Sequence, residues 1–264
     1  AVGFWAVAKA AGPPQIAFNT ANLVARVTGY RYELRNWMTQ HIKTAEATDA
    51  AAWRAICQEI AATGFKAVEV WEAHASPEKL DRAKALEWKK ILDGAGLKAV
   101  AYAGRLSPKT AEICQVLGIP HIDGGLGTLS PEQATALCKE TGIRCNIENH
   151  PEKSADELKK KIGAGNEWLG VCIDTGWLGT QGVSGPDVIK ACGSLVRHTH
   201  IKDVKKAGAH ETCPLGEGVA NVEGCLKALQ AINYQGAYSW EDEPEDRNPF
   251  DSAKRNLAWI AARV

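Results

Sequence analysis

Residues 144–176 read RCNIENHPEKSADELKKKIGAGNEWLGVCIDTG and contain one complete strand–helix–strand unit. Arg144–Glu148 and Leu169–Asp174 are short, largely apolar runs typical of buried strands, and the helix-forming segment Ser154–Ile162 lies between them. Parallel strands need a crossover connection of this kind, which is usually a helix. Each of the two strands ends in an acidic residue. The stretch therefore predicts a parallel sheet with acidic side chains at the carboxyl ends of its strands.

The same alternation of strand and helix recurs along the whole chain. The other expected pairs are Gln15–Phe18 with Asp49–Thr63, Ala67–Ala73 with Pro77–Asp93, Lys98–Ala103 with Ser107–Leu117, His121–Gly124 with Pro131–Glu140, Leu169–Asp174 with Pro186–Cys192, Leu195–Lys202 with Val222–Ile232, and Ala237–Glu241 with Pro249–Ala262. Eight units in 264 residues allow 264/8 = 33 residues for each, which suits a (β/α)8 TIM barrel. A doubly wound open sheet is the alternative, but no G-x-G-x-x-G motif follows the first strand.

We expect one domain over residues 1–264, with an N-terminal extension at 1–14 and a long first βα connection at 19–48. Long connections in compact domains are often functional lids. Within this one, Tyr30–Lys43 is rich in aromatic and basic residues and could close over a polyol. The alternatives for this segment are an oligomer contact and a surface helix.

Composition excludes several classes of protein. The chain has 31 basic and 31 acidic residues, so its formal net charge of zero argues against a general nucleic-acid-binding protein. It has no run of 18 apolar residues, so we expect no transmembrane helix and no membrane partner. Eight cysteines are scattered without a C-x-x-C pair. We interpret them as free thiols packed in the core, which favours a cytoplasmic location.

Chemistry in a TIM barrel takes place at the carboxyl ends of the strands. Four polar residues lie there on consecutive strands: Glu148, Asp174, His200 and Glu241. The first two gaps, 174 − 148 and 200 − 174, are both 26 residues, or about one βα unit. The last gap is longer because it contains the loop Val204–Ala220. Strand alternation then directs Cys172, His198, Lys202 and Ser239 into the barrel as well.

Three carboxylates and one imidazole form a hard, oxygen-rich set of ligands. Without a cation the carboxylates would repel one another and their pKa values would rise. The sequence therefore predicts one divalent metal ion. Mn²⁺ is our first choice, and Mg²⁺, Co²⁺, Fe²⁺ and Zn²⁺ are alternatives.

Several segments resemble one known family. They are IENH at 147–150, CIDTG at 172–176, HTHIKD at 198–203 and CPLGEGVANVEGCLKALQAINYQGAYSWEDEPED at 213–246. Together with the eightfold alternation, they are similar to the xylose isomerase-like TIM barrels. That superfamily includes sugar-phosphate isomerases and epimerases, ketose 3-epimerases, hydroxypyruvate isomerase, inosose dehydratase and endonuclease IV.

The resemblance implies roles for the four strand-end residues. In the family, the residues matching Glu148, Asp174, His200 and Glu241 bind one divalent metal ion. In its epimerases, the two glutamates are also the acid/base pair on opposite faces of the substrate. The resemblance further implies a homo-oligomer. It also implies proton abstraction next to a carbonyl, through a metal-stabilised enediolate, on a sugar, keto sugar or cyclitol.

The same ligands serve different reaction outcomes. Reprotonation gives an isomerase or epimerase, which is our first reading. Loss of a β-leaving group would give a lyase, similar to inosose dehydratase or to enzymes that cleave 3-keto-glycosides or C-glycosides. Epimerases often carry Asp-Thr-x-His on the sixth strand, whereas this chain has Trp177 at the final position. A non-catalytic sugar-binding barrel is the third reading. Endonuclease IV is disfavoured because this chain has few histidines and no net positive charge.

Further side chains are candidates for contact with the substrate. His150 follows Glu148 by two residues and is a candidate general base or substrate contact. The candidate substrate-binding residues are His74, Trp177, His198, Lys202 and Arg247. Each of them has a structural alternative. His74 would be a buried histidine, Trp177 an aromatic residue at the rim, and His198 a support beneath His200. Lys202 would form a salt bridge with Asp203, and Arg247 would be a solvated arginine of a loop.

Overall fold

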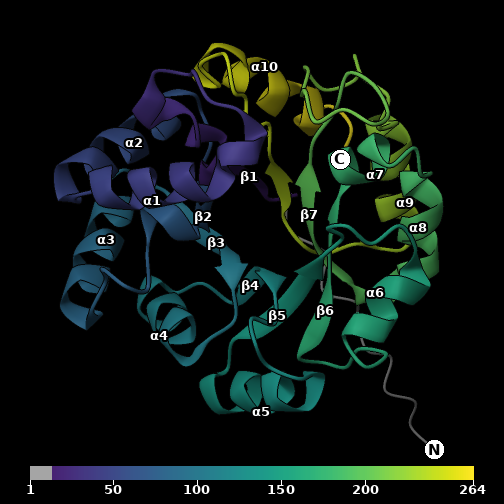
Figure 1. Ribbon diagram of the computed structural model, residues 1–264, viewed down its shortest axis with the longest axis horizontal. Coiled ribbons are helices and arrows are strands. Elements are labelled where there is room, and N and C mark those ends of the chain that lie inside the picture. Colours follow the sequence, from purple (N-terminus) through teal and green to yellow (C-terminus); the bar gives the residue numbers. More distant parts are fainter. Residues whose placement is uncertain (1–13) are drawn as a thin grey trace, which may run out of the picture.

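The computed structural model of the protein describes residues 14–264 and is a closed barrel of eight parallel strands. The strands are β1 Ile16–Asn19, β2 Ala67–Trp71, β3 Lys98–Arg105, β4 His121–Gly125, β5 Arg144–Glu148, β6 Leu169–Asp174, β7 Val196–Ile201 and β8 Tyr238–Trp240. They pair in chain order, and β1 closes the barrel against β8. Figure 1 shows the strands at the centre with the helices around them. The TIM barrel prediction is confirmed, and the open-sheet alternative is wrong. The expected N-terminal extension lies outside the described residues, except for the exposed Pro14.

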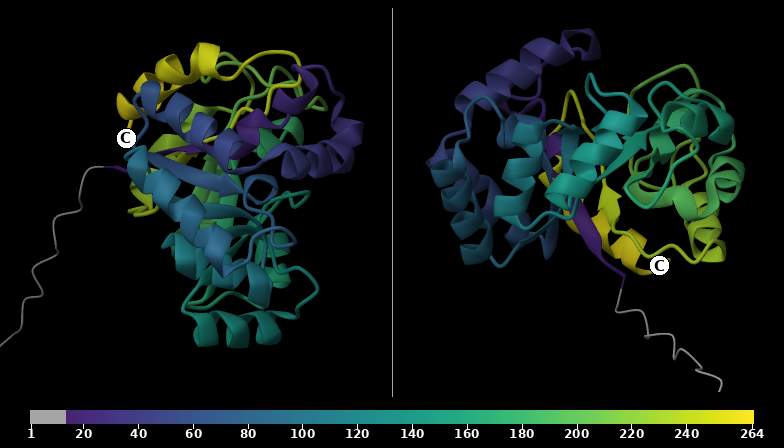
Figure 2. Two further views of the ribbon diagram at one scale, coloured as in Figure 1. Left: turned by 90° about the vertical axis from the view of Figure 1, so that its left-hand side faces the viewer. Right: turned by 90° about the horizontal axis from the view of Figure 1, so that it is seen from below.

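Helices follow the strands and form the outer layer. They are α1 Trp37–Ala47, α2 Ala50–Ala62, α3 Arg82–Gly94, α4 Pro108–Leu117, α5 Pro131–Thr141, α6 Ala155–Lys161, α7 Thr175–Thr180, α8 Gly185–Cys192, α9 Val222–Ala231 and α10 Phe250–Ala261. Helices of the first half of the chain and those of the second half cover opposite sides of the barrel (Figure 2). Several begin at a side-chain cap, as at Asp49, Ser107 and Ser130.

The structure differs from the sequence prediction at two helices. The helix expected over Pro77–Asp93 begins only at Arg82, because the side chain of Asp81 caps it by accepting a hydrogen bond from the Lys84 amide at 2.8 Å. The short helix α7 was not predicted. It begins directly after β6, where the side chain of Asp174 caps it.

The connection over residues 19–48 is ordered into short helical pieces. Three 3-10 turns, Thr20–Leu23, Arg26–Thr28 and Leu34–Asn36, lead into α1. The helix α1 carries the exposed apolar side chains of Met38 and Ile42 on its outer surface. Part of this connection is thus the surface helix that the sequence left as one alternative.

The core has two parts. The larger hydrophobic cluster lies between the barrel and the helices. A smaller cluster of mostly small side chains, Ala17, Ala67, Val100, Ala101 and Ala237, lies inside the barrel. All eight cysteines are free and buried, as predicted. No helix among residues 14–264 is long and apolar enough to cross a membrane.

Candidate active site

The four predicted ligands converge at the carboxyl end of the barrel. We call Glu148, Asp174, His200 and Glu241 the mouth cluster. One ligand atom from each lies within 4.8 Å of those of the other three. The Nδ1 atom of His200 is 3.0 Å from Glu148 Oε1 and 3.5 Å from Glu241 Oε2. The side chains meet because Asp174 and His200 are opposite each other in the register of β6 and β7, while Glu148 and Glu241 end or follow the flanking strands.

Asp174 provides the observation that tests whether these residues suit a metal ion. Its Oδ1 accepts a hydrogen bond from the backbone amide of Trp177 at 3.0 Å. Its Oδ2 is buried and has no hydrogen-bond partner within the described range. Lys202 Nζ lies 3.8 Å from this oxygen. A buried, unpartnered carboxylate oxygen within a set of hard donors fits a divalent cation.

The charges of the mouth cluster are unbalanced towards the acidic side. Burial, followed by the neighbouring carboxylate of Glu243, raises the pKa of Glu241 well above its ordinary value. Burial also raises the pKa of Asp174. Glu148 behaves differently: burial would raise its pKa, but the charge and hydrogen bond of His200 lower it overall. A bound cation would stabilise the charged forms of Glu241 and Asp174, which burial and, after it, neighbouring carboxylates disfavour.

Lys202 is the cation next to the mouth cluster. Its Nζ lies 3.2 Å from Glu241 Oε2 and also forms an ion pair with Glu243. Burial alone would lower the pKa of Lys202, but the carboxylates around it outweigh that effect and hold it well above its ordinary value. A Cβ at Gly176 would lie 2.5 Å from Lys202 Cγ, so the absence of a side chain there makes room for the lysine. Lys202 is therefore fixed within a group of carboxylates.

Glu69 is a residue of this region that sequence reasoning missed. It lies on β2, points into the barrel and is fully buried. Its Oε1 is 3.0 Å from His200 Nε2, and its Oε2 is 2.9 Å from His198 Nε2. Burial would raise the pKa of Glu69, but the two histidines hold it well below its ordinary value. Because Glu69 binds Nε2 of His200, the Nδ1 atom of that ring faces the mouth cluster.

A second polar group lies deeper in the barrel. We call His121, Asp123, Asn146 and His198 the inner cluster. Asp123 accepts hydrogen bonds from His121 Nδ1 at 2.6 Å and from Asn146 Nδ2 at 2.8 Å. His198 Nε2 lies 4.0 Å from Asp123 and is hydrogen-bonded to Glu69. Burial would lower the pKa of His198, but Asp123 and Glu69 raise it overall.

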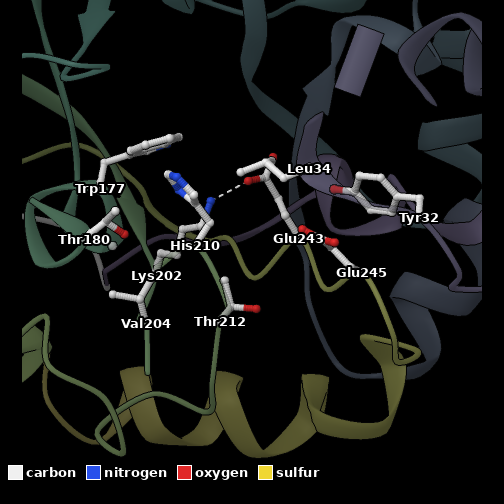
Figure 3. Close-up of a pocket in the computed structure, with 11 residues that line it drawn as sticks. Tyr32, Leu34, Trp177, Thr180, Lys202, Val204, His210, Thr212, Glu243 and Glu245 are labelled. Carbon is white, nitrogen blue, oxygen red and sulfur yellow. Dashed lines mark hydrogen bonds and ion pairs between the residues drawn. The ribbon is translucent and has the colours of Figure 1, made fainter. Parts of the chain in front are cut away.

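A pocket opens beside Lys202, with an empty volume of about 350 Å³ that includes the open solvent at its mouth. It is lined by Tyr32, Leu34, Gly176, Trp177, Thr180, Lys202, Val204, His210, Thr212, Glu243 and Glu245. Trp177 and His210 lie on one side and Tyr32 on the other (Figure 3). The ring centroid of Trp177 is 3.8 Å from that of His150 and 4.7 Å from that of His210. The cavity thus has an aromatic wall near the mouth cluster.

The structure brings some of the predicted substrate-binding residues to this cavity and not others. Trp177 and Lys202 line it, and the exposed His150 contacts Trp177. His198 belongs to the inner cluster below. His74 is buried away from the cavity lining, with Nδ1 3.1 Å from Thr20 Oγ1 and its ring stacked on Trp53.

Arg247 does not line the cavity either. Its Nη2 is 2.6 Å from Asp242 Oδ1 and donates to Thr212 Oγ1 at 3.0 Å. The cavity residues that sequence reasoning missed include His210, Glu243 and Glu245, whereas Tyr32 belongs to the segment Tyr30–Lys43 that was expected to close over a polyol. The acidic run EDEPED directly after the eighth strand was the available signal for the two glutamates.

Comparison with known proteins agrees with this fold. A family model described as xylose isomerase-like TIM barrel matches residues 109–263. The chain belongs to this family. Among curated xylose isomerase-like relatives, an inosose dehydratase of Clostridium perfringens (strain 13 / Type A) is 24% identical over 238 residues, covering 78% of this chain and 77% of that protein. An L-ribulose-5-phosphate 3-epimerase UlaE of Salmonella paratyphi A is 28% identical over 102 residues. That match covers 38% of this chain and 35% of the epimerase, or about a third of its length.

Solved structures of the xylose isomerase-like fold are also similar. An L-ribulose 3-epimerase has a TM-score of 0.69 and 15% identity, with 94% of each chain covered. The probable 3-DHS dehydratase AsbF from Bacillus anthracis has a TM-score of 0.65 and 13% identity, covering 95% of this chain and all of that one. At these identities the likeness shows the fold alone.

Proposed function

We propose that the protein is a divalent-metal-dependent enzyme that removes a proton next to the carbonyl of a keto sugar or cyclitol, as a sugar isomerase or epimerase. The observation that carries the proposal is the mouth cluster, which includes the unpartnered Oδ2 of Asp174. The adjoining cavity is lined by Lys202, whose Nζ lies 3.2 Å from Glu241 Oε2, and is the proposed place for a polyol. Family membership and the relatives named above support an enzyme of this kind.

Different residues of the chain have different proposed roles in the reaction. Glu148, Asp174, His200 and Glu241 would hold one divalent ion, for which Mn²⁺ is our first choice. A bound divalent ion would polarise the substrate carbonyl and stabilise the enediolate that forms when the α-proton is lost.

Glu148 and Glu241 are the proposed proton carriers. Both carboxylates approach Nδ1 of His200 but come from different strands, β5 and the end of β8. As the resemblance to the family's epimerases implies, we propose that they act on the substrate from two sides, one removing a proton and the other returning it. Asn19 Nδ2 donates to Glu241 Oε1 at 2.7 Å and so holds that carboxylate in place. His150, exposed at the rim beside Trp177, is a further candidate base or substrate contact.

A lyase is the second candidate function. The match to inosose dehydratase covers 78% of the chain, whereas the match to the UlaE epimerase covers 38%. Trp177 also stands where many epimerases carry a histidine. In a lyase, the same proton abstraction would be followed by loss of a β-leaving group instead of reprotonation.

Two further proposals concern the protein in its surroundings. The eight free, buried cysteines support a cytoplasmic location, because such thiols persist in reducing compartments. The family resemblance supports a homo-oligomer, and the exposed Met38 and Ile42, one turn apart on α1, are the proposed contact.

The proposed function is tested by proton exchange. Purified protein with Mn²⁺ is incubated in D2O with a panel of ketoses and keto-cyclitols, and deuterium at the α-carbon is measured by NMR. We expect exchange with wild type, loss of about 10³-fold or more in rate with Asp174→Asn, and wild-type exchange with Glu87→Gln, which changes an exposed carboxylate on α3. No exchange across the panel would contradict the proposal. Product analysis then separates the two candidates, since an isomeric sugar indicates an epimerase or isomerase and a dehydrated product indicates a lyase.

A further inference from the structure

The cavity beside Lys202 has an acidic lining. Among the eleven residues that line it, Lys202 is the only one with a permanent positive charge. That charge is already engaged by Glu241 and Glu243. Glu243 and Glu245 add two carboxyl groups to the lining. Figure 3 shows both glutamates between the aromatic wall and Tyr32.

From this arrangement we infer that the cavity selects an uncharged, unphosphorylated sugar or cyclitol and rejects its phosphate ester. The inference rests on the proposed function, because it names the class of substrate for that same site. Of the two curated relatives described above, the name of one is that of an enzyme acting on a sugar phosphate.

The groups that normally recognise phosphate are absent from this lining or already occupied. Arginine forks and helix N-termini are the usual phosphate partners. The guanidinium of Arg247 is paired with Asp242 and lies 3.5 Å from Asp246 Oδ1, and it is not part of the lining. The amide of Trp177 at the start of α7 already donates to Asp174. A phosphate dianion in the cavity would therefore face carboxylates without a free cationic partner.

His210 does not change this balance. Burial and the nearby charge of Lys202 lower the pKa of His210, so its imidazole is neutral at neutral pH. It contributes an aromatic surface and a neutral hydrogen-bonding atom to the cavity instead of a positive charge.

The same lining suits hydroxyl groups and a sugar ring. Carboxylates accept hydrogen bonds from hydroxyls without any need for charge on the ligand. The Oη atom of Tyr32 is buried and has no hydrogen-bond partner within the part of the chain that the structure describes. It is available to a substrate hydroxyl. On the opposite side, Trp177 with His150 and His210 presents aromatic faces on which the C–H face of a ring can stack.

The test compares matched pairs: L-ribulose with L-ribulose 5-phosphate, and D-fructose with D-fructose 6-phosphate. Binding to the Mn²⁺-loaded protein is measured by calorimetry and α-proton exchange by NMR. We expect the sugar of at least one pair to bind at least tenfold more tightly than its ester, and to exchange at least tenfold faster where exchange occurs. Tighter binding of the esters, equal binding within both pairs, or binding of no compound would overturn the inference. Because binding is read without turnover, binding of a sugar without exchange would contradict the proposed function alone.

A charge reversal tests whether the cavity causes the selection. Glu245→Lys should narrow the preference for the sugar over its ester at least fivefold, and the milder Glu245→Gln should narrow it less. The control is Glu87→Lys, the same change of charge at an exposed position on α3, and it should leave the preference unchanged. If the Glu245→Lys variant folds and keeps the wild-type preference for the sugar over its ester, the inference is overturned. If the lysine variant does not fold, an unchanged preference in Glu245→Gln would overturn the inference in the same way.

Discussion

The mouth cluster and the inner cluster occupy the same barrel and use the same residue types, yet their charges are balanced differently. In the inner cluster, the single carboxylate of Asp123 has hydrogen bonds to His121 and Asn146. In the mouth cluster, three carboxylates share one imidazole and Lys202, and an oxygen of Asp174 is left without a partner. Glu69 contacts a histidine of each cluster.

This difference separates the inner cluster, whose polar groups stabilise the fold, from the mouth cluster, whose polar groups are suited to bind a ligand. In the inner cluster the one carboxylate meets its partners, and the atoms without a partner among the described residues, Asn146 Oδ1 and His198 Nδ1, are not carboxylate oxygens. A buried surplus of carboxylates raises the free energy of the folded chain until a cation binds. Charge balance, more than burial or residue type, therefore distinguishes the two clusters.

The largest expected effect is on the inner cluster. Asp123→Ala removes the acceptor for His121 and Asn146 and should lower the free energy of unfolding of the metal-free protein by about 3 kcal/mol. Glu148→Gln removes one of several crowded carboxylates, so its unfolding free energy should lie within about 1 kcal/mol of wild type. Urea denaturation in the presence of a chelator measures both values. Equal losses in the two variants would remove the distinction between the clusters.

Glu69, which joins the clusters, should matter for metal binding more than for folding. Glu69→Gln keeps the shape of the side chain but weakens its hold on His200 Nε2, so the dissociation constant for Mn²⁺ should rise about 10- to 100-fold. Metal titration followed by calorimetry gives this value. The control is Glu72→Gln, just beyond the end of β2 and outside both clusters. An unchanged dissociation constant in Glu69→Gln would show that Glu69 does not position His200.

A smaller effect is expected at His74, a buried histidine outside both clusters. Burial lowers the pKa of His74 from 6.5 to about 3. The unfolded chain therefore takes up a proton below about pH 6.5 that the folded chain does not. The contribution of His74 is present in full above that pH, and it is lost as the pH falls towards 3, by at most about 1.4 kcal/mol per pH unit.

Replacement of His74 should remove this part of the acid sensitivity. In urea denaturation between pH 6.5 and pH 4, His74→Gln should show a shallower fall in the free energy of unfolding than wild type. A slope identical to that of wild type would mean that His74 becomes protonated in the folded protein as readily as in the unfolded chain.

Much of the fold could be predicted from the sequence because its evidence is local. The alternation of strands and helices, together with the helix caps, predicted the barrel. The strands β5 and β6 begin and end where predicted. The mouth residues were found because each stands at the end of its strand. Their convergence followed from the topology, and the structure confirms that Glu148, Asp174, His200 and Glu241 come together.

Other features depend on contacts between distant segments and so escaped prediction. Glu69 lies in the middle of β2, and its importance comes from two histidines about 130 positions away. The helix α7 spans six residues, two of them glycines, and it forms because Asp174 caps it and Gly176 makes room for Lys202. His74 ends up stacked on Trp53 because the chain turns after β2, and no strand pattern encodes that turn.

The central claim is that the mouth cluster holds one divalent ion, and equilibrium dialysis against Mn²⁺ tests it most directly. Metal content per chain is measured by mass spectrometry for wild type and for Glu148→Gln at the same free Mn²⁺ concentration. The account predicts about one ion per wild-type chain and a clear loss in Glu148→Gln, with both proteins folded by circular dichroism. Equal metal content in the two proteins would contradict it.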